Sequence, residues 1–156
     1  MKKYLIFTPL ILACFLADAQ VLTATSNPVN LDFGYPELRF KNDVIRFIDE
    51  NDNGIIDPGE GTIIRLVIEN LGKYPARDVI LQPQELNQIN GLELPVEIEV
   101  GDIEAGEQKV VQVGVAAADE LDTGTANFIF YAKEAAEKGR VSVVYAVATV
   151  VDPNEK

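Results

Sequence analysis

The residues whose types and spacing suggest chemistry lie in one short segment, Asp49–Glu60, with the sequence DENDNGIIDPGE. Side chains that bear oxygen stand at positions 1, 3, 5, 9 and 12 of this segment, and Gly54 stands at position 6. Calcium takes six to eight oxygen ligands, and a twelve-residue loop supplies them from positions 1, 3, 5, 7, 9 and 12. The segment therefore predicts a loop that binds one calcium ion. Its predicted ligands are Asp49, Asn51, Asn53, the backbone carbonyl of Ile55, Asp57 and Glu60.

Three of these ligands carry a charge, namely Asp49, Asp57 and Glu60. A low ligand charge predicts weak binding, with a dissociation constant of about 10⁻⁴ to 10⁻³ M. Glu60 can bind with both oxygens, so Glu60→Gln is expected to weaken calcium binding and to leave the ion-free fold nearly unchanged. The alternative is a plain turn-rich loop, since Asp, Asn, Gly and Pro are common in turns. A turn, however, does not require this spacing.

The segments that must position the loop are β-prone on both sides. VIRFI, residues 44–48, precedes the loop, and TIIRLVIEN, residues 62–70, follows it. In the second segment Ile64, Leu66 and Ile68 lie on one face of the strand, and this face is predicted to be buried. Ile56, at position 8 of the loop, is expected to point away from the ion and to anchor the loop in the core. Without flanking helices the ion cannot open a helix pair as a sensor does, so its predicted role is structural.

Further strand-like segments follow at close spacing. LELPVEIEV, residues 92–100, alternates over nine positions and predicts a half-buried strand at a sheet edge, because Pro95 has no N–H to donate. Its polar face, with Glu93, Glu97 and Glu99, is expected to be solvated. Helical composition is confined to residues 133–139, which we interpret as a long turn. Seven or eight strands without helices between them predict an all-β fold, an antiparallel immunoglobulin-like β-sandwich. The other predicted strands are residues 37–40, 77–81, 108–117, 125–133 and 141–151.

The first 19 residues have the features of a secretory signal peptide. Lys2 and Lys3 precede an apolar run, and Ala17-Asp18-Ala19 offers a cleavage site. Cleavage there would leave a chain that begins at Gln20; a lipoprotein signal with lipidated Cys14 is the alternative. Residues 20–36 are polar and turn-rich and are interpreted as a leader arm. The sandwich domain is expected over residues 37–152 and a polar tail over residues 153–156. We expect a protein that is secreted, periplasmic or on the cell surface.

Composition excludes most hydrolase chemistry. The 156-residue chain has no His and no Trp, and its single Cys lies in the signal segment. Without His or Cys the mature chain cannot form a Ser-His-Asp triad, a Cys-His pair or an ordinary zinc site. The net charge of the whole chain is −12; removal of residues 1–19 takes away two basic residues and one acidic residue, which gives −13. A surface of this sign repels nucleic acid. No segment predicts a membrane span.

The segment FIDENDNGIIDPGEGTIIRLVIENLGKYPARDVIL resembles the opening of a bacterial immunoglobulin-like module, in which an acidic loop ending in DPGE precedes a strand that ends in an Asn-x-Gly turn. The later segment IEVGDIEAGEQKVVQVGVAAADELDTGTANFIFYAKEA is similar to the rest of the same module. The resemblance is to the cell-adhesion-related (CARDB-like) domains of secreted bacterial proteins, and to modules beside caspase-like peptidase or helical-repeat domains. It covers about residues 36–151. The resemblance implies an accessory or adhesive module.

The sequence thus predicts a secreted interaction or adhesion module with one structural calcium ion, no catalytic activity, and a protein or glycan partner in the cell envelope. A small carbohydrate-binding module is the first alternative, with Tyr74 and Tyr131 as candidate sugar contacts; the absence of Trp weighs against it. A glycosidase that works with carboxylates alone is the second. That activity requires two acids facing each other across a cleft, about 5 to 10 Å apart.

Overall fold

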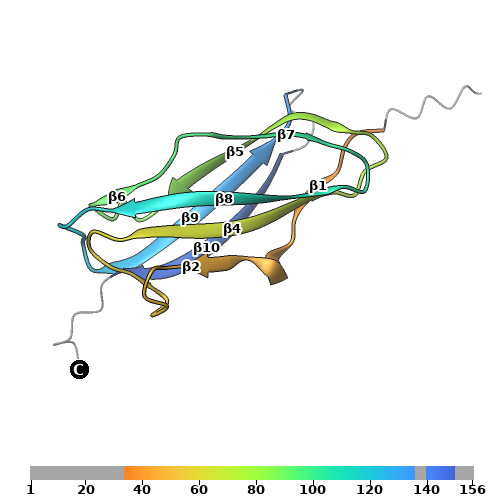
Figure 1. Ribbon diagram of the computed structural model, residues 1–156. Coiled ribbons are helices and arrows are strands. Elements are labelled where there is room, and N and C mark those ends of the chain that lie inside the picture. The colour runs from red at the N-terminus through yellow and green to blue at the C-terminus, as the bar shows by residue number, and fades with distance from the viewer. Residues whose placement is uncertain (1–33, 136–139, 150–156) are drawn as a thin grey trace, which may run out of the picture. The chain divides into compact units, whose positions relative to one another are not determined.

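The computed structural model describes residues 34–135 and 140–149 (Figure 1). The chain divides into two units, Met1–Asp32 and Phe33–Lys156, and all described residues belong to the second. The predicted signal peptide, Cys14, most of the predicted leader arm and the polar tail lie outside the described residues. No helix in the described ranges is long and apolar enough to span a membrane.

The described chain consists of strands, turns and one short 3-10 turn, η1 (Asn42–Val44). Ten strands form two sheets of five, which confirms the predicted all-β sandwich. The strands are β1 (Leu38–Phe40), β2 (Arg46–Ile48), β3 (Ile55–Ile56), β4 (Gly61–Asn70), β5 (Ala76–Glu85), β6 (Leu92–Glu93), β7 (Ile98–Ile103), β8 (Gln108–Ala117), β9 (Gly124–Lys133) and β10 (Arg140–Thr149).

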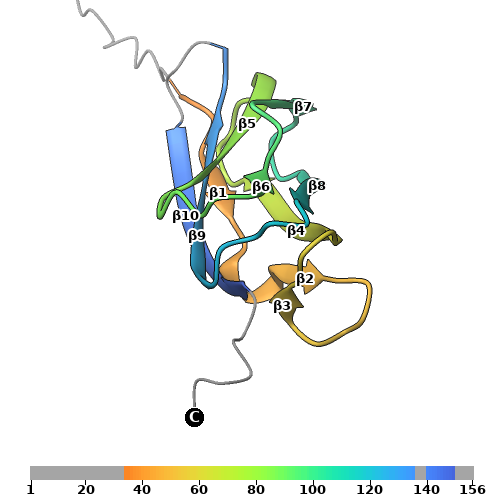
Figure 2. The same cartoon turned by 90° about the vertical axis from the view of Figure 1, so that its left-hand side faces the viewer.

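The two sheets lie face to face (Figure 2). The first sheet has the order β1-β4-β8-β6, and β2 pairs with β4 next to β1. The second sheet has the order β3-β10-β9-β5-β7. All pairs are antiparallel except β3 with β10, where Ile55 and Ile56 run parallel to Ala148 and Thr149. The short β3 therefore ties the predicted calcium loop to the second sheet, although the strands on either side of that loop, β2 and β4, belong to the first.

The core lies between the sheets, at the positions that alternation predicts. Ile64, Leu66 and Ile68 of β4 are fully buried. Phe128 and Phe130 of β9 are also fully buried, with their rings stacked at 6.4 Å between centroids. Burying each of these side chains stabilises the fold by about 1.5–3 kcal/mol. Val111, Val113 and Val115 of β8 and Ala126 of β9 are also buried.

The prediction of one continuous strand over residues 92–100 is wrong. The segment is divided between the sheets, since β6 pairs with the end of β8 in the first sheet and β7 pairs with β5 in the second. Val96, at the crossing, is 87% exposed although the alternating pattern places it inward. Alternation shows which side chains share a face but not which sheet the strand joins, and Pro95 removes a donor where the ladder ends. The three glutamates of this segment are exposed, as predicted.

The corner after β4 is organised by one buried asparagine. Asn70 is fully buried, and its side-chain oxygen accepts hydrogen bonds from the backbone N–H of Glu37 and of Gly72, both at 3.0 Å. Its side-chain nitrogen donates to the carbonyls of Tyr74 at 2.8 Å and Ile103 at 3.0 Å. All four hydrogen-bonding positions of the amide are therefore occupied. The residue joins the segment before β1, the turn after β4 and the end of β7.

Gly72→Ala is expected to destabilise the protein by about 1–3 kcal/mol, a typical cost of overpacking. A β-carbon at this position would lie 2.5 Å from the backbone nitrogen of Glu37 and 2.7 Å from the carbonyl oxygen of Tyr35. The nitrogen of Glu37 cannot move away without lengthening its hydrogen bond to Asn70. Urea denaturation measures the change. Gly114→Ala is the matched control, because a β-carbon there meets nothing within 4 Å; equal stabilities of the two variants would contradict this interpretation.

Candidate functional site

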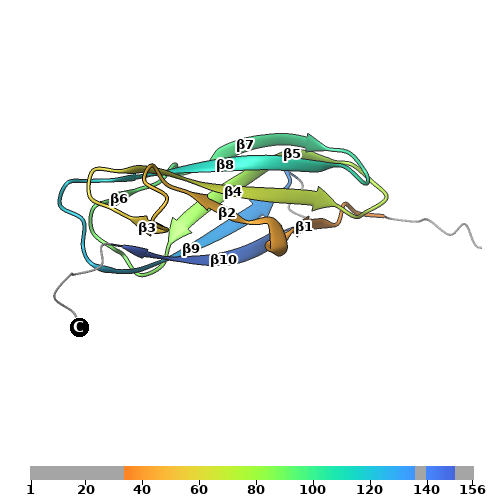
Figure 3. The ribbon, with the colours of Figure 1, turned by 60° about the horizontal axis from the view of Figure 1, so that its bottom comes forward.

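The predicted calcium loop lies between β2 and β4 at one end of the sandwich (Figure 3). Ile56 at its eighth position is fully buried, as the sequence predicts for an anchor. The next residues form a tight turn, in which Gly59 has a φ of +77° and its N–H donates to the carbonyl of Ala118 at 3.1 Å. The loop is therefore fixed to the core in its second half, while residues 51–54 are exposed to solvent.

The first half of the loop is folded by its own side chains. A carboxylate oxygen of Asp49 accepts the N–H of Gly54 at 2.8 Å. The side-chain oxygen of Asn51 accepts the N–H of Asn53 at 3.0 Å, and that of Asn53 accepts the N–H of Ile55 at 2.8 Å. Each of these bonds closes a local turn of the backbone. Gly54 supplies the required left-handed conformation, with a φ of +78°.

The polar side chains of the loop converge on Asp57. The side-chain nitrogens of Asn51 and Asn53 both donate to Oδ2 of Asp57, each at 2.7 Å. The side chains of five of the six predicted ligands make hydrogen bonds within the loop, and the loop carries no Cys, His or Lys. This group of oxygens is of the kind that a hard cation such as calcium prefers. To bind an ion, however, the two amides must present oxygen instead of nitrogen, which requires their rotation.

Glu60 has a role that the sequence did not indicate. Its side chain is buried, and its two carboxylate oxygens accept the backbone N–H of Glu50 at 2.8 Å and that of Asp57 at 3.0 Å. Its own carbonyl accepts the N–H of Ala117 in β8 at 2.9 Å. Glu60 therefore connects the start of the loop, its end and the neighbouring strand. The position after the DPG turn and before a buried strand is the one sequence signal for this role.

The six predicted ligands remain a prediction. Among residues 34–135 and 140–149, no three or more His, Cys, Asp or Glu side chains are arranged as a metal-binding group. The hydrogen bonds at Glu60 use one lone pair of each oxygen, so a second lone pair of each is still available to a cation. The structure brings the side chains of Asn51, Asn53 and Asp57 together, and the assignment of individual ligands rests on their spacing.

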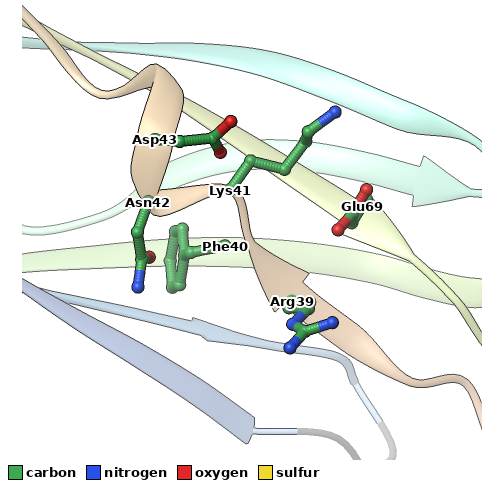
Figure 4. Close-up of a pocket in the computed structure, with 6 residues that line it drawn as sticks. All are labelled: Arg39, Phe40, Lys41, Asn42, Asp43 and Glu69. Carbon is green, nitrogen blue, oxygen red and sulfur yellow. The ribbon is translucent and has the colours of Figure 1, made fainter.

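The hollows in the described surface are shallow, and each is lined by a different set of residues. One of about 360 Å³ lies beside β1 and η1, where side chains of opposite charge face it (Figure 4). A second, of about 540 Å³, lies where β6 separates from β8 and contains one carboxylate, that of Glu93. A third, of about 190 Å³, is lined by Asp78 and Glu99 at the β5–β7 pair. The residues around the first are Arg39, Phe40, Lys41, Asn42, Asp43 and Glu69.

The two candidate sugar contacts do not share a site. Tyr131 lies on the outer face of the second sheet, and the guanidinium of Arg140 covers its ring at 4.4 Å from the centroid. Tyr74 lies in the turn after β4, with its ring against Gly34. Neither residue lines any of the hollows described above.

An exposed charge cluster supports an irregularity in the β5–β7 pair. The carboxylate of Asp102 accepts the N–H of Asp78 at 2.9 Å and the guanidinium of Arg77 at 2.6 Å. The hydrogen bond from the backbone of Asp78 has the larger effect and the bond from Arg77 the smaller, and both hold the pKa of Asp102 below its usual value. Asp102 and then Glu104 raise the pKa of Arg77. Asp78 has a φ of +48° at the register shift of β5, so the cluster stabilises a strained backbone position.

Comparison with known proteins identifies the fold. The sequence matches no protein-family model and no curated protein sequence. The structure is similar to the CARDB domain of a protein from Pyrococcus furiosus, crystallised in complex with di-metal ions, with a TM-score of 0.51, 16% identity, and coverage of 74% of this chain and 90% of that one. A FixG-related protein from Vibrio parahaemolyticus gives a TM-score of 0.47 at 12% identity over 73% of this chain and 97% of that one. The two five-stranded sheets and the similarity to the CARDB domain show that the described part of the chain is an immunoglobulin-like β-sandwich with the fold of a CARDB domain.

Proposed function

We propose that this protein is a secreted interaction or adhesion module, without catalytic activity, that is stabilised by one calcium ion in the loop Asp49–Glu60. The observation that carries the proposal is the convergence of the loop's oxygen-bearing side chains on Asp57, in a loop that connects strands of both sheets. The CARDB domain from Pyrococcus furiosus was crystallised with metal ions, which agrees with a metal in a domain of this fold.

The predicted ligands offer oxygen atoms, which are the donors that calcium prefers. Asp49, Asn51, Asn53 and Asp57 offer side-chain oxygens, Ile55 offers its carbonyl, and Glu60 offers the outer lone pairs of a carboxylate. The loop concentrates negative charge in a chain that is already acidic, and a divalent cation relieves that repulsion. An ion held by residues on both sides of Ile55–Ile56 would fix the crossing from the first sheet to the second, and this effect is structural rather than regulatory.

The remaining parts of the proposal rest on composition. The signal-like segment at residues 1–19 supports export, and the absence of His and Cys from the rest of the chain supports a role in binding and not in catalysis. The partner in this proposal is a protein or glycan of the cell envelope. The guanidinium of Arg140 covers the ring of Tyr131, a candidate sugar contact. This favours a protein partner over a glycan partner.

Calcium is expected to raise the midpoint of thermal unfolding, because an ion that binds only the folded state stabilises it by RT ln(1 + [L]/Kd). At a free calcium concentration 100 times Kd, this amounts to about 2.7 kcal/mol. The test compares melting curves in excess chelator, in calcium and in magnesium at the same ionic strength. Asn51→Asp adds a ligand charge and should increase the calcium-dependent shift. Superimposable curves in chelator and at a calcium concentration 100 times the predicted Kd, about 10 to 100 mM, would rule out the stabilising ion.

A further inference from the structure

The outer face of the first sheet carries two arginines side by side. Arg46 of β2 pairs in register with Arg65 of β4, and Arg65 pairs with Gln112 of β8. All three side chains are exposed. Arg46, Arg65 and Gln112 are called the arginine row below. Side chains directly opposite each other on antiparallel strands have β-carbons about 4.5–5.5 Å apart, so two like charges here repel each other.

The arginine row forms no ion pair in the described ranges. Arg65 forms no ion pair there, and the guanidinium of Arg46 donates to backbone carbonyls, those of Ile45 at 3.0 Å and Asp43 at 3.5 Å. Arg77, by contrast, binds the carboxylates of Asp102 and Glu104. The chain has 25 acidic residues for 13 basic ones. Two facing arginines without a carboxylate are therefore unusual in this chain, and their positive charge is available to a partner.

Apolar side chains border the arginine row on both sides. On the side nearer the loop, two residues along the strands, Ile48 pairs with Ile63, and Ile48 is 43% exposed. On the opposite side, Val67 pairs with Val110, which is 52% exposed. Same-face neighbours along a strand are about 6.6–6.8 Å apart, so the face alternates apolar, basic and apolar at the spacing of an extended chain. If the arginine row were the only feature of this face, it would attract any polyanion without discrimination. The two apolar rows add a requirement for apolar groups between or beside the negative charges.

We propose that this face binds an acidic segment of a partner protein. Neighbouring carboxylates of the segment pair with Arg46 and Arg65, and its apolar side chains cover the Ile48–Ile63 and Val67–Val110 pairs. This inference rests on the proposed role as an interaction module and is independent of calcium. Charge complementarity selects the partner, because an acidic chain that shows positive charge on one face attracts negative groups there and repels them elsewhere. A second copy of this acidic chain is disfavoured by net repulsion.

The test uses two synthetic probes on the full mature chain, a short peptide of alternating Glu and Val and, for comparison, dextran sulfate. Peptide binding is measured by fluorescence anisotropy at low and at physiological salt, in calcium and in chelator. Amide NMR shifts should map to β2, β4 and β8 and not to β9 or β10. Because each exposed ion pair contributes modestly, Arg65→Gln should weaken binding about threefold and Arg46→Gln/Arg65→Gln about tenfold at low salt. Binding should decrease as salt rises.

Arg140→Gln is the matched control, since it removes an exposed arginine from the second sheet and should leave peptide binding unchanged. Arg65→Gln should keep or raise the thermal midpoint, because it relieves like-charge repulsion; a structural arginine would lower it. Unchanged binding by the double variant, or shifts confined to other strands, would overturn the proposal. Binding of dextran sulfate as tight as that of the peptide, or tighter, would also overturn the proposal, because it would indicate a site for polyanions in general. Self-association that the double variant abolishes would overturn it as well. Failure of calcium to stabilise the protein leaves this test intact.

Discussion

Replacing Asn70 by alanine is expected to lower the free energy of unfolding by about 3–5 kcal/mol, the largest effect of any single substitution considered for this protein. The variant leaves two N–H donors, of Glu37 and Gly72, and two carbonyl acceptors, of Tyr74 and Ile103, without their partner. A buried group that loses its only partner costs about 1–3 kcal/mol. Urea denaturation followed by circular dichroism measures the change.

Asn70→Asp separates hydrogen bonding from size, because it keeps the shape and replaces the donating nitrogen by an acceptor. Two carbonyls would then face a carboxylate, so we expect a loss comparable to that of alanine. The matched control is Asn42→Ala in η1, where the side chain is exposed and the change should stay within about 0.5 kcal/mol. A loss below 1 kcal/mol for Asn70→Ala would show that water or a backbone shift replaces the asparagine.

Replacing Glu60 is expected to destabilise the protein even when no calcium is present. Both oxygens of this buried carboxylate accept backbone N–H groups, those of Glu50 and Asp57. Glu60→Ala removes both acceptors and should cost about 2–4 kcal/mol. Glu60→Gln keeps one acceptor and brings an amide NH₂ toward a backbone donor, so a smaller loss of about 1–2 kcal/mol is expected. This differs from the sequence-based expectation that Glu60→Gln leaves the ion-free fold nearly unchanged.

The same variants separate the two roles of Glu60. Unfolding is measured in chelator and in calcium, and the difference between the two reports the contribution of the ion. If Glu60 is a ligand, the calcium-dependent stabilisation decreases in Glu60→Gln beyond the loss seen in chelator. If Glu60 only connects the loop ends, that stabilisation stays as in the unsubstituted chain. Glu97→Gln, in an exposed segment between β6 and β7, is the control and should change neither quantity. Unaltered stability of Glu60→Ala in chelator would contradict the structural role.

The buried faces of this sandwich could be predicted from the sequence because they depend on a local property. Side chains of a strand alternate between two faces, so Ile64, Leu66 and Phe128 had to lie on the apolar side of their strands wherever those strands paired. The turn of the loop was also predictable, since Gly54 at its sixth position and the alternating Asp and Asn residues favour that conformation by short-range sterics and hydrogen bonds. The absence of His from the sequence excluded a Ser-His-Asp triad without any structure.

Tertiary structure decided what depends on partners distant in the sequence. Residues 92–100 alternate without interruption, yet the chain crosses from one sheet to the other at Val96, because the choice of sheet depends on pairing with β8 and then β5. Glu60 has the same residue type whether it binds an ion or two backbone N–H groups, and only the approach of Glu50 in space makes it a structural acceptor. Arg46 and Arg65 lie 19 positions apart, and their pairing depends on the register of β2 against β4, which the packing of the core determines.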